Sequence, residues 1–166
     1  MPRAVNAKTH RHIRLHRDPH HYDPAHRLQT VTDSRGSKTL TYSYSPGGQR
    51  TRLQTSDGAV TSYGYDPVGR LTSLWAPDGG SVTLGYDPGG RLVEQRYPNG
   101  ATTRSTWNAD NTLAQLLTQV GSTTVSQHDY TYDAASNRVT HTERIGSTTT
   151  PYGYTYDPLN RLTTVT

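Results

Sequence analysis

The sequence has no cysteine and no phenylalanine, one methionine and two tryptophans. Without cysteine the chain has no disulfide, no thiol nucleophile and no thiolate metal ligand. Only 30% of its 166 residues are apolar, whereas an ordinary globular domain has about 45–50%, so we expect no thick single core. No stretch approaches the roughly 18 apolar residues of a membrane-spanning helix. We also expect no export signal, because the first residues lack the apolar segment of a signal peptide.

Beyond residue 21 the sequence has no excess of positive or negative charge. Residues 1–21 hold five basic groups and one acid, whereas residues 22–166 hold twelve of each. A neutral body does not supply the basic stripe on which nucleic-acid binding depends. We therefore expect 1–21 to be a basic, His-rich leader, disordered or a degenerate repeat, and we predict no cofactor. Its His10 and His12 provide two metal ligands, fewer than the three or four of a stable zinc site, so we predict no metal site.

The sequence does contain a repeat of 21–25 residues over 22–166. An aromatic residue followed by Asp, Asn or Ser returns after steps of 22, 21, 21, 21, 25 and 24 residues. The second position after the aromatic residue is Pro in five of seven copies, and the fourth is usually Gly or Asn. This order is typical of a type I turn closed by a left-handed residue. The aromatic residues, called anchors below, are Tyr22, Tyr44, Tyr65, Tyr86, Trp107, Tyr132 and Tyr156.

These turns are the candidate structural sites. Asp accepts hydrogen bonds within the turn, Pro presets φ, and Gly or Asn adopts positive φ at little cost. The clearest copies supply Asp66, Pro67, Gly69, Asp87, Pro88, Gly90, Asp157, Pro158 and Asn160.

A second turn signal lies halfway along each repeat. Four pairs end in Gly and predict two-residue type I′ turns, and two pairs begin with Gly and predict type II′ turns. The first group is Arg35-Gly36, Asp57-Gly58, Asp78-Gly79 and Asn99-Gly100, and the second is Gly121-Ser122 and Gly146-Ser147.

Short turns at both ends make consecutive strands antiparallel neighbours. The fold class is therefore all-β, an antiparallel hairpin meander that forms a curved or spiralling sheet. Apolar or aromatic residues alternate with polar ones, as at Leu40, Tyr42 and Tyr44, which predicts one covered face. Residues 113–120 carry leucines at helical spacing, but the turn signals on both sides favour a long strand.

The string Tyr65-Asp66-Pro67-Val68-Gly69-Arg70-Leu71, echoed at 86–92 and 156–162, resembles the YD repeat of the RHS family. The segments 48–50 and 136–138 are similar to that family's Gly-Asn-Arg variant. Copies at 22–28 and 107–113 are degenerate, and the resemblance covers 22–166.

The resemblance implies bacterial polymorphic toxins, toxin-complex subunits and related animal adhesion proteins, in which many repeats form a hollow β-sheet shell or scaffold. The expected partners are the remaining RHS repeats and a C-terminal toxin domain of a secreted or cell-surface parent. Because no plug or effector follows Thr166, we interpret the chain as a piece of such an array or a truncated reading frame.

No catalytic residue is predicted. The Asp-Pro-x-Gly strings recur at many turns, which favours turn formation over a singular cleavage site. Arg70, Arg91 and Arg161 have two interpretations, an anion-binding row or pairing with the turn aspartates, and pairing is favoured. We therefore expect a non-catalytic structural segment. The alternative is a surface carbohydrate-binding repeat that uses an open aromatic row of Tyr44, Tyr65, Tyr86, Trp107, Tyr132 and Tyr156.

Overall fold

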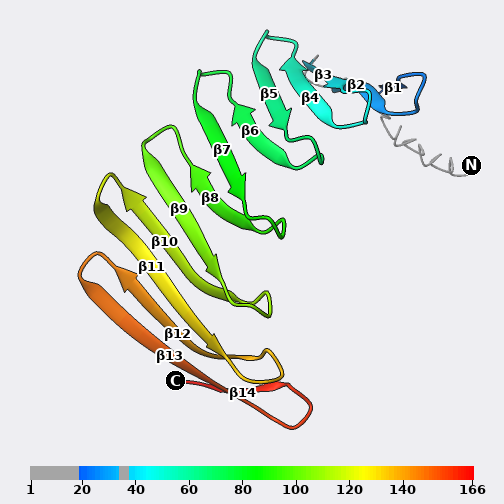
Figure 1. The fold of residues 1–166 in the computed structure, drawn as a ribbon. Coiled ribbons are helices and arrows are strands. Elements are labelled where there is room, and N and C mark those ends of the chain that lie inside the picture. The colour runs from blue at the N-terminus through cyan, green and yellow to red at the C-terminus, as the bar shows by residue number, and fades with distance from the viewer. Residues whose placement is uncertain (1–18, 34–37) are drawn as a thin grey trace, which may run out of the picture.

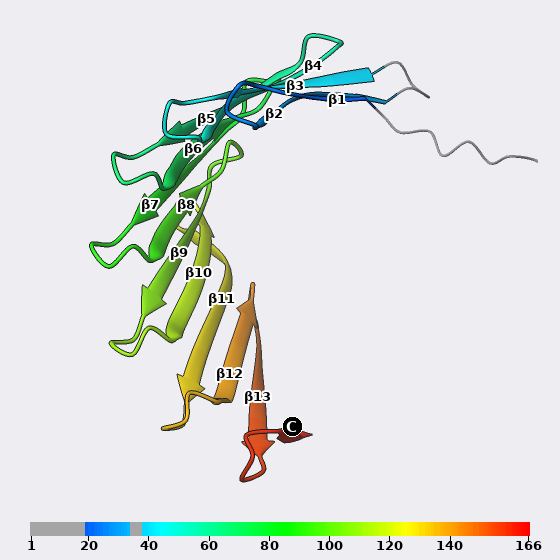
Figure 2. The same cartoon turned by 90° about the vertical axis from the view of Figure 1, so that its right-hand side faces the viewer.

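The computed structural model describes residues 19–33 and 38–166. In this part of the chain fourteen strands follow one another as antiparallel neighbours in a single sheet. The sheet is an open band with β1 and β14 at its two edges (Figure 1), and it bends along its length (Figure 2). The all-β meander expected from the sequence is confirmed. The predictions for His10, His12 and Arg35-Gly36 lie outside the described residues.

The strands alternate between the two directions of the sheet. They are β1 (His20–Tyr22), β2 (Leu28–Asp33), β3 (Lys38–Tyr44), β4 (Arg50–Thr55), β5 (Val60–Tyr65), β6 (Leu71–Trp75), β7 (Ser81–Tyr86), β8 (Leu92–Arg96), β9 (Ala101–Trp107), β10 (Leu113–Val120), β11 (Thr123–Tyr132), β12 (Arg138–Ile145), β13 (Thr148–Tyr156) and β14 (Leu162–Val165). Residues 113–120 form a strand, as the flanking turn signals predicted, and not a helix.

The register between repeats is constant although the repeat length varies. At every junction between repeats, the residue eight positions after one anchor pairs with the residue three positions before the next. The pairs are Thr30↔Thr41, Arg52↔Ser62, Ser73↔Thr83, Glu94↔Arg104, Gln115↔Asp129 and Thr140↔Gly153. The longer repeats therefore place their extra residues in the far halves of β10–β13, which have 8, 10, 8 and 9 residues.

The type I′ prediction for the midway turns is wrong at the three described pairs that end in Gly. In the turn after β4, Gly58 has a φ of 92°, whereas Asp57 does not have positive φ. The Thr55 N–H donates to the Ala59 carbonyl at 2.9 Å, which encloses a three-residue loop. Asp78-Gly79 and Asn99-Gly100 follow the same pattern. A type I′ turn would force Asp or Asn to positive φ, whereas a type I turn followed by a left-handed residue requires positive φ only of Gly.

The two turns that begin with Gly are two-residue loops. Gly121 and Gly146 have φ values of 58° and 57°, and the serines that follow them do not have positive φ. Val120 pairs with Thr123, and Ile145 pairs with Thr148. This geometry fits the type II′ turn.

The sheet is a single layer with almost no buried interior, in line with the shortage of apolar residues. Among the described residues only Ala101, Ser73 and Thr103 are buried. No second layer packs on either face of the described sheet, so the covered face expected from the alternation stays a prediction. Alternation makes one face richer in tyrosine and leucine and the other richer in threonine, serine and charge. A difference in polarity between faces does not by itself supply a cover.

Candidate functional site: the junctions between repeats

Each aromatic-Asp turn is held closed by its own side chains. In the turn after β5, the Gly69 N–H donates to the Asp66 carbonyl at 2.9 Å, and the Asp66 N–H donates to the Arg70 carbonyl at 3.0 Å. Asp66 Oδ1 also accepts from the Val68 and Arg70 N–H groups at 3.1 and 2.9 Å. Gly69 has a φ of 87°. Asp66, Pro67 and Gly69 thus occupy the first, second and fourth positions of a type I turn closed by a left-handed residue.

All seven copies use positive φ at the fourth position after the anchor. Glycine fills it in three copies, and an L-residue fills it in the other four at φ values of 58–68°. Serine and histidine can therefore occupy this position, although they do so less readily than glycine or asparagine. The residues are His26, Gly48, Gly69, Gly90, Asn111, Ser136 and Asn160.

The arginine that follows the left-handed residue forms an ion pair across its own turn. Arg70 Nε lies 2.7 Å from Asp66 Oδ2, and the pair is only partly exposed. The same 2.7 Å pair occurs at Asp23–Arg27, Asp87–Arg91 and Asp157–Arg161. These contacts favour pairing with the turn aspartates over an anion-binding row.

The turn carboxylates are stabilised in their ionised form. At Asp87 the backbone N–H of Arg91, followed by the Arg91 guanidinium, lowers the pKa of the carboxyl below its usual range. The pKa of Asp157 is lowered in the same way by Arg161. Hydrogen bonds to an ionised carboxylate favour that form. A carboxyl with a lowered pKa is suited to a capping role near neutral pH and poorly suited to act as a general acid.

The anchors connect each repeat to the preceding one. The hydroxyl of Tyr86 donates to the backbone carbonyl of Leu71 at 2.8 Å, and the hydroxyl of Tyr65 donates to that of Arg50 at 2.8 Å. At all six junctions the acceptor lies six positions after the preceding anchor. The other donor–acceptor pairs are Tyr44–Leu28, Trp107–Leu92, Tyr132–Leu113 and Tyr156–Arg138, at 2.7–3.0 Å. The indole N–H of Trp107 replaces the tyrosine hydroxyl, which explains why tryptophan can replace tyrosine there.

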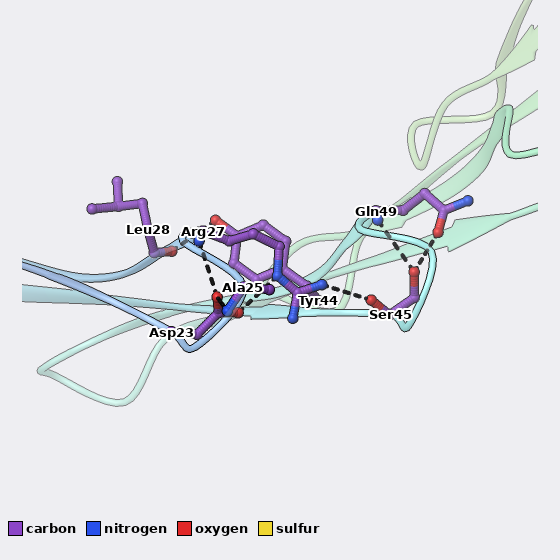
Figure 3. A network of polar contacts seen from close by, with 7 residues as sticks. All are labelled: Asp23, Ala25, Arg27, Leu28, Tyr44, Ser45 and Gln49. Carbon is purple, nitrogen blue, oxygen red and sulfur yellow. Dashed lines mark hydrogen bonds and ion pairs between the residues drawn. The ribbon is translucent and has the colours of Figure 1, made fainter.

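The turn arginine also reaches forward to the next repeat. Figure 3 shows Arg27 between the turn of its own Asp23 and the turn that begins at Ser45. Its Nη1 donates to the Ser45 carbonyl at 2.9 Å, and its guanidinium lies 4.8 Å from the centroid of the Tyr44 ring. Arg70 takes the same place over Tyr86, at 4.7 Å. A single arginine thus joins a carboxylate, an aromatic face and a backbone carbonyl.

The predicted aromatic row is built into these junctions. Its six members are half-buried, and their polar atoms are already used in hydrogen bonds. They stand on every second strand, about 10 Å apart by the strand spacing, so they do not stack on one another. Tyr22, at the edge of the sheet, differs from them because it is 60% exposed.

At two repeats an arginine replaces leucine six positions after the anchor. Arg50 lies 5.9 Å from the Tyr42 ring centroid and 4.5 Å from that of Tyr63. Arg138 lies 5.8 Å and 4.4 Å from the centroids of Tyr130 and Tyr154. The Nε of Arg138 is buried without a hydrogen-bond partner, so its ring contacts carry the interaction. Tyrosines two positions before the anchors form these sandwiches.

A stack of histidine and tyrosine rings crosses β11, β12 and β13. The His141 ring lies 5.3 Å from His128, 4.8 Å from Tyr130 and 5.3 Å from Tyr152 between centroids. His128 Nδ1 is 3.0 Å from His141 Nε2 and 3.7 Å from Glu143 Oε1. Burial, followed by the neighbouring His128, lowers the pKa of His141. The stack carries a pH-sensitive group in an otherwise structural region.

The opposite face carries polar networks and one exposed aromatic ring. Glu94 contacts Arg96 at 2.7 Å and Arg104 at 3.2 Å. Trp75 is 47% exposed. Its indole ring lies next to Gly64, where the Cβ of any other residue would be 3.3 Å from the ring. Glycine at position 64 therefore allows the indole ring to approach the backbone of β5 closely.

Features of an enzyme site are not found in the part of the chain that the structure describes. No cavity is detected there, and no three His, Asp or Glu residues are grouped so that they could hold a metal ion. That same part contains no helix with the length and apolar character needed to cross a bilayer.

Sequence reasoning located the anchors and the turn arginines and favoured the pairing of these arginines with the turn aspartates, but it missed the contacts that both make with neighbouring repeats. The carbonyl acceptors carry no residue-type signal because every residue has a backbone carbonyl. The forward reach of Arg27 and Arg70 depends on the repeat register, which fixes the distance between neighbouring turns. The His128–His141 stack was missed because the two residues come together only once β11 and β12 are paired, with His128 opposite Glu143 and His141 opposite Tyr130.

Comparisons with known proteins agree with this geometry. The family model described as RHS Repeat matches residues 22–60 and 65–103. Among solved structures, TcdB2–TccC3 aligns with a TM-score of 0.71 at 15% identity, covering 85% of this chain and 9% of that chain. TcdB2–TccC3–Cdc42 aligns with a TM-score of 0.71 at 14% identity, covering 85% and 8%. The Photorhabdus luminescens Tc holotoxin pore with mutated TccC3 aligns with a TM-score of 0.66 at 19% identity, covering 75% of this chain and 6% of that chain.

These alignments establish a shared fold. The chain spans less than a tenth of the length of the chains that it matches. A search of curated protein sequences found no match.

Proposed function

We propose that this chain is a non-catalytic wall segment of a larger RHS-repeat protein, part of a shell that encloses or displays a C-terminal toxin or effector domain. The observation that carries the proposal is the fixed junction, in which an anchor side chain binds the backbone of the preceding repeat six times in succession. Such a device extends a sheet by equal steps, which is what a wall requires.

The bend of the sheet and the fold of the matched structures support the same proposal. The band curves as a single layer (Figure 2), so one face is turned inward along its whole length. Its fold is shared with TcdB2–TccC3 and with the Tc holotoxin pore. By this analogy we propose that the parent is secreted or presented at the cell surface, and that its other repeats and its toxin domain are the partners.

The carbohydrate-binding alternative is not favoured. A sugar-stacking row needs open ring faces, whereas the six row members are half-buried, and arginines lie over Tyr44 and Tyr86. Their hydroxyl groups donate to backbone carbonyls. The side chains that would bind glycans are therefore engaged in holding the repeats together.

Protection from protease tests the proposal in the parent protein. The parent, expressed with its natural flanking sequence, should hold its C-terminal domain in a protease-resistant form, and Tyr86→Leu together with Tyr65→Leu should make that domain cleavable. Tyr97→Leu is the matched control, because Tyr97 is an exposed tyrosine outside the row. A C-terminal domain that is cleaved equally in the native parent and in the double variant would refute enclosure by this wall.

A further inference from the structure

His128 and His141 are the only two histidines after position 26, and they lie against each other. His128 is four positions before the anchor of its hairpin, and His141 is nine positions after it. The four hairpins from β3 to β10 have uncharged residues at the same two positions. These residues are Leu40 and Leu53, Thr61 and Leu74, Val82 and Gln95, and Thr103 and Leu116. The histidine pair therefore belongs to one hairpin and is not a feature of the repeat.

The geometry of the pair limits the number of protons that it can hold. The hydrogen bond between His128 Nδ1 and His141 Nε2, 3.0 Å long, requires one nitrogen that carries a proton and one that does not. One added proton is compatible with this bond, because a protonated His128 can donate to His141 and lies 3.7 Å from the Glu143 carboxylate. A second added proton places an N–H on both facing nitrogens. The hydrogen bond is then lost, and two positive rings face each other.

The surroundings of His141 favour its neutral form. The titratable or charged groups around it on this face are His128 and Tyr130 from β11, Tyr152 and Tyr154 from β13, and Arg138 and Glu143 from its own strand. Burial, followed by His128 and Arg138, lowers the pKa of His141, and only Glu143 acts in the opposite direction. In an open state the ring would regain its ordinary pKa of about 6.5. Opening therefore becomes more favourable as the pH falls below about 6.5.

The stack lies between the anchors and the far halves of three neighbouring strands, β11, β12 and β13 (Figure 1). On the anchor side, the junction hydrogen bonds of Tyr132 and Tyr156 hold these strands. On the far side the strands continue to the midway turns, and Ile145 is exposed there. One side-chain hydrogen bond, from Arg144 to Gln127 at 3.0 Å, joins β12 to β11 on the opposite face. The far halves therefore depend on the stack more than the anchor ends do.

We propose that His128 and His141 form a proton-operated switch, which opens the far halves of β11–β13 when both rings are charged. Near neutral pH the rings stay stacked and the strands stay paired along their whole length. In mild acid the second proton separates the rings, and the segments 123–128 and 141–150 open while the anchor ends remain closed. The inference goes beyond the proposed wall function, because it concerns how this segment responds to acid and does not depend on an enclosed domain.

Hydrogen exchange at two pH values locates the opening. Between about pH 7.5 and about pH 5.5, protection factors of amides in 123–128 and 141–150 should fall about tenfold, the effect of losing one hydrogen bond. Residues 60–96 are an internal control, because they contain no histidine. Carboxyl groups with ordinary pKa values of about 4 stay ionised over this range. Unchanged protection in 123–128 and 141–150, or an equal fall in 60–96, would overturn the proposal.

Two variants give this hairpin the residues that Thr61 and Leu74 supply at the same positions of another hairpin, so both are compatible with the fold. His141→Leu should abolish the response of the two segments to pH. His128→Thr should reduce the response, because the like charge is removed while His141 remains half-buried. A His141→Leu chain that still opens in mild acid, or a His128→Thr chain that opens as fully as the natural chain, would overturn the proposal.

Titration of the two imidazole rings by NMR tests the number of protons that the switch requires. Because the rings interact, the pair should take up its two protons in two separate steps. The loss of protection in 123–128 and 141–150 should follow the step at lower pH. Uptake of both protons in a single step, or opening that follows the step at higher pH, would overturn the proposal.

Discussion

The junction hydrogen bond from Tyr86 can be removed with almost no change in shape. Tyr86→Phe deletes the hydroxyl that donates to the Leu71 carbonyl at 2.8 Å and keeps the ring beneath Arg70. A net hydrogen bond contributes about 0.5–1.5 kcal/mol. Because Tyr86 is half-buried, water can reach the freed carbonyl only in part, and we expect a loss of about 1 kcal/mol in the free energy of unfolding.

Further variants separate the hydroxyl from the ring. Tyr86→Leu should cost more than Tyr86→Phe because it also removes the ring that Arg70 covers, a contact that contributes about 0.5–1 kcal/mol at an exposed site. A double-mutant cycle with Arg70→Met and Tyr86→Leu isolates this contribution, because the loss of the Asp66 pair cancels between the two Arg70→Met backgrounds.

Urea unfolding followed by circular dichroism measures these differences, and thermal unfolding should shift by about 2–4 °C for each kcal/mol. Tyr97→Phe is the matched control, since that exposed hydroxyl contacts only Gln95 at 3.2 Å. If Tyr86→Phe unfolds at the same urea concentration as Tyr97→Phe, the Tyr86 hydroxyl does not stabilise the contact between repeats. A coupling energy near zero in the cycle would likewise refute the role given to the guanidinium.

Two other predictions concern the faces of the sheet. Gly64→Ala should destabilise the chain more than Gly85→Ala, because a Cβ at 64 meets the Ser73 hydroxyl and the Trp75 ring, whereas a Cβ at 85 lies at ordinary contact distance from Glu94; equal urea midpoints would contradict this. The lowered pKa of His141 means that the folded state binds fewer protons than the unfolded state, so stability should be full above about pH 6.5 and fall as the pH drops below it. His141→Phe should flatten this part of the urea-midpoint profile, and an unchanged profile would contradict the assignment.

A second acid transition should follow at lower pH. The pKa of the Asp87 carboxyl is depressed by the Arg91 N–H and guanidinium, so its contribution is present above the unfolded pKa of about 4 and is lost as the pH falls through the lower folded value. The His141→Phe variant should change only the dependence on pH that His141 causes, and the loss at lower pH should remain.

Much of the fold could be predicted because its determinants are local. The spacing of the anchors and the Pro and Gly positions around 66–69 specify the turns from residue types alone. The same logic failed at Asp78-Gly79, where Pro77 was the available signal: proline presets the φ of the first central position of a type I turn, which makes the loop three residues long. Pro98 precedes Asn99-Gly100 in the same way, whereas Ser56 precedes Asp57-Gly58 and gives no such signal.

The junction itself could not be predicted from residue types, because one of its two partners is always backbone. Tyr65 and Trp107 carry different polar groups, yet both donate to the carbonyl six positions after the preceding anchor. Only the constant register makes the two side chains equivalent. The extra residues near 113–120 leave that register unchanged because they lie at the far end of the strands, away from the row of anchors. What is constant across this array is therefore the separation of six residues between one anchor and the carbonyl that accepts the next anchor. The length of the repeat can vary wherever that separation is kept.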